Sequence, residues 1–362
     1  MTFFILLRRF PKTIGHEAIP GGFVMNDHII FLDLGLFEVY WFGFFVGCGL
    51  LVAAVIYCVL RRLQKKDLCD SLTTVLCVMP VSLFFSRMSY CWFSSASFSG
   101  DFSEYFRLSD GGYSLSGALL GVLIILLIRS RKHNDFLQML DAAVPAISST
   151  IAIGRFASAT GGENTGFEVK FDGNLSLPFL QWSETEQEWV LWVGFFEGIA
   201  ALIIAGLSMV LFMRTYRSDN ATYPKGCATL SFMLTYGLSQ AFLESMRSDS
   251  LFMVTLGFVR VDQIISIVLA VAAVIIICVN HYKAKGFSVQ LVLAWLLCAA
   301  ALVIAFYCEF TMNATYLGVL YLIMGSALAV MWIVSAILFV RTLHAPSVAE
   351  RKSGVQKPVI DL

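Results

Sequence analysis

The sequence predicts an all-α integral membrane protein that crosses the bilayer several times. Hydrophobic residues make up 58% of the 362 residues and charged residues only 14%, whereas a soluble domain is about 45 to 50% apolar and about 25% charged. The mean hydropathy is +0.78. The apolar residues form long continuous runs, and about 20 residues cross the hydrocarbon layer as a helix. Such runs are too long for barrel strands, and lipid leaves no partner for free backbone groups, so helices are expected.

Nine apolar runs are long enough to be transmembrane helices. They cover residues 41–60, 72–93, 113–130, 136–158, 189–213, 226–246, 261–280, 288–307 and 316–340. Residues 1–25, which end at a second methionine, are interpreted as an N-terminal extension. Residues 342–362 are polar and are expected to form a solvated tail.

Basic residues follow every odd-numbered run. They are RRLQKK (61–66), RSRKH (129–133), RTYR (214–217), HYKAK (281–285), and Arg341 with the ERK of the tail (350–352). Loops rich in lysine and arginine stay in the cytoplasm, so the N-terminus is predicted outside and the C-terminus in the cytoplasm. The longest polar loop, residues 161–188, then lies outside, either as a lid that contacts a substrate or as a plain solvated loop.

The charge balance and the cysteines argue against several kinds of partner. Lysine plus arginine equal aspartate plus glutamate at 25 each, so net charge gives no sign of nucleic-acid binding, and no such partner is expected. The nine cysteines are scattered, without a CxxC pair or a Cys/His cluster at metal-ligand spacing. No metal site and no cofactor are therefore expected.

Polar residues that lipid disfavours fall at the predicted outer ends of the second to seventh helices. They are Arg87, Tyr90, Asp110, Gly111, Gly112, Ser116, Arg155, Ser158, Glu163, Glu197, Glu244, Arg247, Asp262 and Gln263. An arginine at membrane depth costs about 2.5 to 3.5 kcal/mol on insertion scales, so it usually faces protein, water or an anion. Asp141, at the predicted inner start of the fourth helix, is the exception to this layer.

The arginines of this layer favour an anion-binding site. Three arginines against two or three carboxylates predict a local positive surplus, and a guanidinium matches the oxygens of a phosphate. The simplest anion at this depth is a phospholipid phosphate. Glu244 and Arg247, three residues apart, share one helical face, so Glu244 is expected to orient Arg247. The alternative is that Arg155, Arg247, Glu197 and Glu244 only pair to lock helices together.

Motifs around these residues resemble those of one known family. DGGYSLSGALLG (110–121) resembles the D-G-G-M-S-F-H-G-G-L-I-G of bacterial prolipoprotein diacylglyceryl transferases. The family's spaced aspartate, proline, glycine–arginine and glycine–glutamate match Asp141, Pro145, Gly154, Arg155, Gly162 and Glu163. SRMSY resembles G-R-I-G-Y, YGLSQAFLESMRSD resembles a Y-G segment followed by E-x-x-R, and VDQIISI resembles M-G-Q-I-L-S-I. The chain is similar to a divergent member of this family.

The resemblance implies a fold and a reaction. The family has a seven-helix core, which corresponds here to residues 26–283. Residues 284–341 would add two helices, for a total of about nine membrane crossings. It transfers the diacylglyceryl group of phosphatidylglycerol to the lipobox cysteine of a prolipoprotein, which forms a thioether and releases glycerol phosphate. Implied partners are phosphatidylglycerol, the prolipoprotein signal peptide and membrane lipids. The implied location is the plasma (inner) membrane of a bacterial cell, with the site facing outward.

The resemblance also implies roles for single residues. Catalytic roles would belong to Arg155, Arg247, Glu163, Glu244 and Ser116. Substrate binding would belong to Arg87, Tyr90, Asp110, Gly111, Gly112, Ser158, Gly162, Glu197, Tyr236 and Gln263. Ser116 stands where the family has histidine, and Ser158 where it has asparagine. The group that accepts the thiol proton is therefore open among Glu163, Glu197, Glu244 and Tyr90.

Two other interpretations are left open at this point. A paralogue of the same fold would bind lipid or prolipoprotein without transfer, because the family histidine is Ser116. An unrelated transporter would carry its polar groups near the midplane in two related halves.

Overall fold

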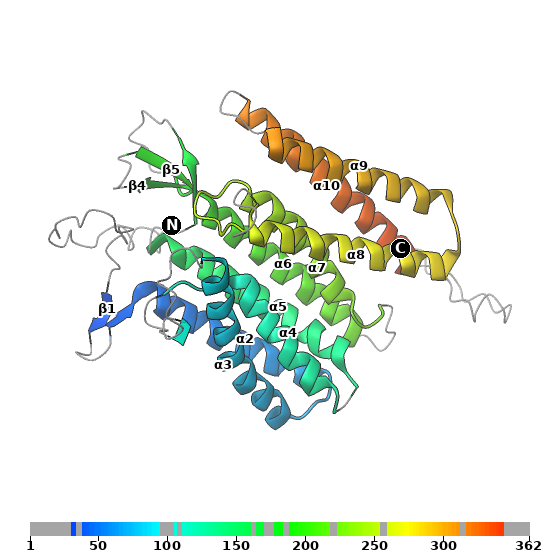
Figure 1. Cartoon of the computed structure of the whole chain (residues 1–362). Helices are drawn as coiled ribbons and strands as arrows, with labels where there is room; N and C mark the ends of the chain where they lie inside the picture. The colour runs from blue at the N-terminus through cyan, green and yellow to red at the C-terminus, as the bar shows by residue number, and fades with distance from the viewer. Residues whose placement is uncertain are drawn as a thin grey trace.

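The computed structural model describes residues 30–33, 38–94, 105–106, 111–132, 134–160, 164–169, 177–183, 188–217, 223–253, 259–311 and 316–343. Within these ranges nine long helices lie side by side, and short strands gather at one end of the bundle (Figure 1). The predicted extension (1–25) and all but the first two residues of the predicted tail lie outside the described residues.

Each predicted apolar run overlaps one helix. The helices are α2 (Trp41–Leu63), α3 (Leu68–Phe93), α4 (Leu115–Ser130), α5 (Phe136–Ala157), α6 (Val193–Tyr216), α7 (Cys227–Glu244), α8 (Val261–Lys285), α9 (Val289–Thr311) and α10 (Leu317–Leu343). Seven of them, all except α4 and α7, are long and apolar enough to cross a membrane, so this is a multi-pass membrane protein. Because α4 has only 16 residues and α7 carries several polar ones, the number of nine crossings stays a prediction.

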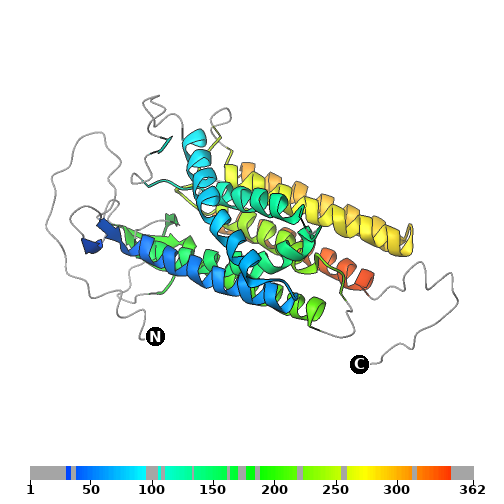
Figure 2. The same cartoon turned by 90° about the horizontal axis from the view of Figure 1, so that it is seen from below.

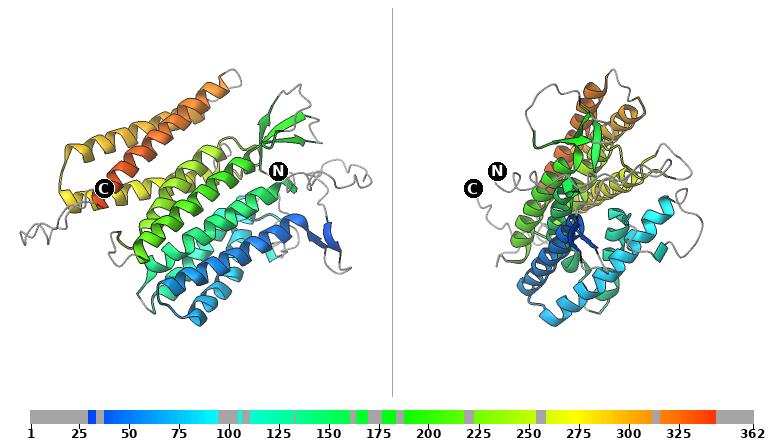
Figure 3. Two further views of the ribbon diagram at one scale, coloured as in Figure 1. Left: turned by 180° about the vertical axis from the view of Figure 1, so that it is seen from behind. Right: turned by 90° about the vertical axis from the view of Figure 1, so that its left-hand side faces the viewer.

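Most of the helices form one row. Along this row, α2 packs on α5, α5 on α6, α6 on α7 and α7 on α8. The α9–α10 hairpin packs on α7 and α8 through α10 (Figure 3). The α3–α4 pair lies beside this row, and α3 crosses it at a steep angle (Figure 2). Gly121 allows α3 and α4 to approach, because a Cβ there would lie 2.7 Å from Ser82 Cα.

Asp141 holds the start of α7. Its side chain is fully buried in α5 and accepts hydrogen bonds from the Tyr216 hydroxyl (2.9 Å), the Gly226 N–H (2.6 Å) and the Thr229 N–H (3.0 Å). The Thr229 hydroxyl donates a further one at 2.8 Å. The first N–H groups of a helix have no partner within it. Asp141 therefore caps α7 from a neighbouring helix, which accounts for this buried acid away from the polar layer.

The strands lie at the end of the bundle opposite the last turn of α10 (Figure 1). β1 (Ile30–Asp33) pairs with β2 (Glu38–Tyr40), and β3 (Thr165–Glu168), β5 (Glu188–Trp192) and β4 (Leu180–Ser183) form an antiparallel sheet in that order. The predicted start of a helix at residue 189 is wrong. Val190 and Trp192 are buried while Glu188 is exposed, the two-residue alternation of a strand.

Basic residues occupy the last turns of α2, α4, α6, α8 and α10, as the sequence predicts. Helices joined by short connections alternate in direction, so these basic turns lie at the end away from the strands. Which end faces the cytoplasm stays a prediction.

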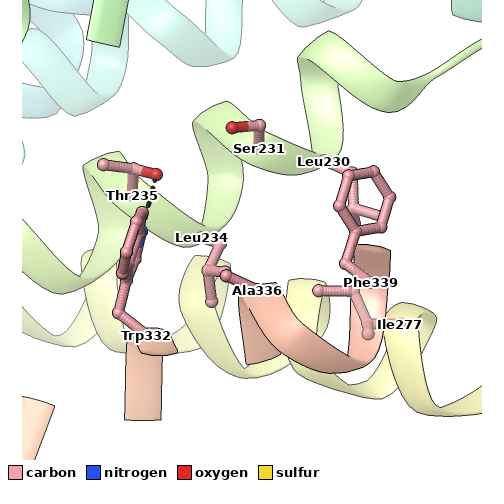
Figure 4. Close-up of a pocket in the computed structure, with 8 residues that line it drawn as sticks. All are labelled: Leu230, Ser231, Leu234, Thr235, Ile277, Trp332, Ala336 and Phe339. Carbon is pink, nitrogen blue, oxygen red and sulfur yellow. Dashed lines mark hydrogen bonds between the residues drawn. The ribbon is translucent and has the colours of Figure 1, made fainter. Parts of the chain in front are cut away.

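A small pocket lies between α7, α8 and α10 (Figure 4). Its volume is about 40 Å³, and its lining is mainly apolar, with Leu230, Leu234 and Phe339 among its residues. At its edge, Trp332 Nε1 donates to Thr235 Oγ1 at 3.0 Å. Ligand pockets measure about 300 to 1,000 Å³, and no predicted site residue lines this one, so it is a gap in helix packing.

Candidate functional site

Two arginines from separate segments meet on one buried carboxylate. Arg155 lies in the last turn of α5, and Glu197 about one turn into α6. Arg155 Nε lies 3.1 Å from Glu197 Oε2, and Arg247 Nη1 lies 4.0 Å from Glu197 Oε1. The Glu197 side chain is only 1% exposed. Glu197 therefore joins the ends of α5 and α7 through its charge.

Arg247 makes two further ion pairs. Its Nη1 lies 3.3 Å from Glu244 Oε2, which confirms the predicted contact between residues three apart. Its Nε donates to Asp249 Oδ1 at 2.9 Å. Gln240 Nε2 donates to both Glu197 Oε1 (2.7 Å) and Glu244 Oε2 (3.3 Å), so it links the two buried carboxylates.

Asn164 closes these contacts into a ring. Arg155 Nη1 donates to Asn164 Oδ1 at 2.6 Å, and the Asn164 N–H donates to Asp249 Oδ2 at 2.9 Å. Asn164 has φ of 59°, in the left-handed region that asparagine tolerates better than most residues. We call Arg155, Glu197, Arg247, Asp249 and Asn164 the arginine ring.

β3 supports the ring from the outer sheet. Gly166 pairs with Arg247 as an isolated β-bridge, and the Ser248 N–H donates to Thr165 O at 2.9 Å. A Cβ on Gly166 would lie 2.6 Å from Met246 O, so glycine is needed for this close approach. The sheet β3–β5–β4, which the sequence did not predict, therefore holds the backbone of Arg247 in place.

The charges of the ring hold one another ionised. Burial raises the pKa of the Asp249 carboxyl. The charge of Arg247 and the hydrogen bond from the Asn164 N–H lower this pKa by more, so it lies below its ordinary value. Burial lowers the pKa of Arg247, and the carboxylates of Glu197, Glu244 and Asp249 outweigh this and raise it. Both groups are charged at neutral pH.

The sequence predicts a positive surplus from three arginines, but the ring contacts include only two of them, because Arg87 binds the carbonyls of Gly111 and Gly112 instead. Arg155 and Arg247 face three carboxylates, Glu197, Glu244 and Asp249. The sequence could not show that Asp249 turns back onto Arg247. Glu197 and Glu244 are buried, whereas the Asp249 side chain is 36% exposed, so Asp249 is the most accessible of the three carboxylates.

Arg87, Tyr90, Gly111 and Gly112 form a second group. The buried Arg87 donates through Nη1 to Gly111 O and, at 3.2 Å, to Gly112 O. Both glycines have positive φ, 67° and 72°. A Cβ on Gly112 would overlap the Tyr90 ring, so this turn requires glycine and fits the end of α3.

Other predicted site residues lie between the helices that carry these groups. The Ser116 hydroxyl, at the start of α4, lies 2.7 Å from Ser114 Oγ. Gln263 Nε2 donates to Ala241 O at 3.3 Å. Gln263 thus links α8 to α7.

Ser158 and Tyr236 take structural contacts beside the ring. Ser158 Oγ donates to Arg155 O at 2.7 Å and accepts from Trp192 Nε1 at 3.3 Å. The buried Tyr236 ring stacks on Phe232, with centroids 5.0 Å apart. Ser158 therefore fixes the end of α5 against β5.

Three predicted site residues, Asp110, Gly162 and Glu163, lie outside the described residues. Conversely, Asn164 of the ring and Gln240 beside it were not among the predicted site residues. Gln240 lies four residues before Glu244, a spacing that puts both on one face and could have identified it. Asn164 offered no comparable signal, because its contact to Arg155 depends on the turn that follows α5.

Comparison with known proteins places the chain in a family. A sequence profile described as prolipoprotein diacylglyceryl transferase matches residues 29–279. The phosphatidylglycerol–prolipoprotein diacylglyceryl transferase of Ligilactobacillus salivarius is 27% identical over 255 residues, 70% of this chain and 93% of the relative. Those of Halalkalibacterium halodurans (28%, covering 72% and 88%) and Bacillus cereus (29%, covering 69% and 91%) are similar. The chain belongs to the prolipoprotein diacylglyceryl transferase family.

Proposed function

We propose that this protein transfers the diacylglyceryl group of phosphatidylglycerol to the lipobox cysteine of prolipoproteins. The observation that carries the proposal is the meeting of Arg155 and Arg247 on Glu197 at the end of a membrane helix bundle. Guanidinium groups fit phosphate oxygens and keep their charge when partly buried. Family membership and the relatives' reaction support the same substrates.

The phosphate of the lipid would bind at the arginine ring. Asp249 Oδ1 accepts the hydrogen bond of Arg247 Nε at 2.9 Å. The Asp249 carboxylate is the most exposed of the three. A phosphate oxygen replaces it there, while the buried Glu197 keeps both arginines in place. The two guanidinium groups then offset the charge that develops on the departing glycerol phosphate.

Glu244 is the proton acceptor that the contacts favour. Its Oε2 is bonded to Arg247 and Gln240, but its Oε1 is buried and has no hydrogen-bond partner among the described residues. Oε2 of Glu197 also has no hydrogen-bond partner among these residues, but it lies 3.1 Å from Arg155 Nε, and Oε1 accepts a hydrogen bond from Gln240. The Tyr90 ring packs against Gly112, and Glu163 lies outside the described residues.

The reaction is then a displacement at carbon. The cysteine thiol gives its proton to Glu244, and the thiolate attacks the carbon of the diacylglyceryl unit that is bonded to the phosphate oxygen. A carbon–sulfur bond forms as the carbon–oxygen bond breaks, and glycerol phosphate leaves with the electron pair. The site would face outward from the inner membrane of a bacterial cell, where prolipoproteins arrive.

Complementation tests the proposed function. A bacterial host depleted of its own transferase receives this chain and a reporter prolipoprotein with a lipobox. The expected product is a reporter that carries thioether-linked diacylglycerol, detected by mass spectrometry. Absence of this product, with the protein present in the membrane, would contradict the proposal.

Variants then test the arginine ring. Arg155→Ala and Arg247→Ala are each expected to abolish labelling of the reporter while the protein level is kept. Arg214→Ala is the matched control, because Arg214 lies at the other end of the bundle and contacts the Tyr223 hydroxyl. Activity retained in both ring variants would remove the phosphate-binding role.

A further inference from the structure

The α9–α10 hairpin lies beyond the stretch that matches the family, which ends at residue 279. Its helix α10 packs against α7 and α8, and α9 packs mainly on α10 (Figures 1 and 3). The buried contact includes Met324 and Leu328 of α10 against Leu234 of α7 and Ala270 of α8. The hairpin is thus an integral part of the helix bundle, and its outer end reaches the segment that carries Arg247.

Tyr321 of α10 contacts that segment directly. Its hydroxyl donates to Ser245 O at 2.9 Å, and both residues are buried. Ser245 follows Glu244 and precedes Arg247 by two positions, so this carbonyl belongs to the turn that aims the arginine. Carbonyls at the end of a helix lack partners within it, and Tyr321 supplies one from another helix.

The Tyr321 ring holds the same turn from two further sides. It stacks on Phe167 of β3, with centroids 5.9 Å apart and planes at 19°. It meets Phe242 of α7 edge to face at 6.3 Å. β3 is also the strand whose Gly166 pairs with Arg247. One side chain therefore touches both backbone segments that fix Arg247.

A second contact holds the other end of the connection between α7 and α8. Arg260, the residue before α8, lies with Nη1 2.6 Å from Glu309 Oε1 of α9. The backbone of Arg260 pairs with Phe252, three residues after Asp249. The hairpin thus contacts the segment between α7 and α8 at Ser245 and at Arg260. These two contacts lie on either side of Arg247 and Asp249 in the sequence.

We infer that the α9–α10 hairpin positions Arg247 for the transfer, and that Tyr321 is its main positioning residue. The inference rests on the proposed function, because it concerns the geometry of that same site. A small displacement of a group that stabilises a leaving group lowers the rate even when the fold is intact. The two added helices are then part of the working site.

Tyr321→Phe is the variant that tests this role, because it removes the hydroxyl and keeps both ring contacts. The kcat of transfer is expected to fall about three- to tenfold, the factor that corresponds to one hydrogen bond, with KM for the prolipoprotein unchanged. Trp332→Phe is the matched control. It removes a hydrogen bond of the same hairpin to Thr235, about 14 Å before Glu244 along α7, and should leave kcat unchanged.

A double-mutant cycle separates positioning from general packing. The fold reduction in kcat caused by Tyr321→Phe should approach one in an Arg247→Lys background. In a Trp332→Phe background it should keep its full size. Glu309→Gln weakens the ion pair between Glu309 and Arg260. Its reduction of kcat should depend on Arg247 in the same way, so this variant tests the inference if Tyr321→Phe is poorly folded.

Three results would overturn the inference while the wild-type protein is active. They are full activity in both Tyr321→Phe and Glu309→Gln, an equal loss in Trp332→Phe, and a loss that is independent of Arg247. An inactive wild-type protein would instead contradict the proposed function itself.

Discussion

At the scale of single residues, the site depends on Glu197, which is shared by Arg155, Arg247 and Gln240. Glu197→Gln leaves two largely buried guanidinium groups, 13% and 10% exposed, without their common carboxylate. Removal of one partner from a buried ion pair costs about 3 to 5 kcal/mol. We expect a loss of that size in the free energy of unfolding, measured by denaturation in detergent micelles, together with loss of transfer. Glu188→Gln, at the exposed start of β5, should change neither.

Asp249 gives the site a dependence on acid. Its pKa is below the ordinary value in the folded state, so its stabilising contribution is present above the unfolded pKa of about 3.9 and is lost as pH falls through the folded value. Below about pH 4 the melting temperature of the wild type should therefore fall more steeply than that of Asp249→Asn. Parallel melting curves from pH 6 to 3 would show that Asp249 makes no such contribution.

At the scale of the elements, close helix contact depends on particular glycines. A Cβ on Gly237 of α7 would lie 2.6 Å from Ser266 O and 2.8 Å from Ala270 N, which are backbone atoms of α8. Gly237→Ala should destabilise the protein by about 1 to 3 kcal/mol, because α8 must move. Gly206→Ala in α6, with open space around it, should be neutral or stabilising by up to about 1 kcal/mol. Equal melting temperatures for the two variants would contradict this account.

The helices could be predicted because each apolar run fixes one element, whereas the outer sheet could not. In EWVLW (188–192) the apolar residues continue into α6, so the strand β5 is hidden at the start of an apolar run that predicts a helix. Spacing predicted the Glu244–Arg247 contact correctly. The roles of Asn164 and Asp249 depend on two turns that meet in space, and local pattern carries no information on such a meeting.

At the scale of the whole molecule, two polar clusters lie at opposite ends of an apolar bundle. One is the arginine ring beside the strands; the other joins Asp135 to Arg61 (2.7 Å) and Lys66 (3.0 Å) near the basic helix ends. Burial raises the pKa of Asp135, but these two basic groups lower it more, so the carboxyl is held below its ordinary pKa. The two clusters mark the two ends of the described helix bundle. In the arginine ring, Arg155 and Arg247 are 13% and 10% exposed, whereas Arg61 of the other cluster is fully buried.

The predicted orientation of this bundle can be tested with a native thiol. Cys69, in the first turn of α3 beside RRLQKK, is the exposed one of the nine cysteines, while the others are buried or half-buried in helices. If the basic ends face the cytoplasm, a membrane-impermeant maleimide should label Cys69 in inverted vesicles and not in spheroplasts. Cys69→Ser should abolish this label, and adding Glu188→Cys to it should reverse the pattern, because Glu188 is exposed in the strand layer at the other end. Labelling of Cys69 in intact spheroplasts would place the arginine ring on the cytoplasmic side, where it could not meet a translocated prolipoprotein.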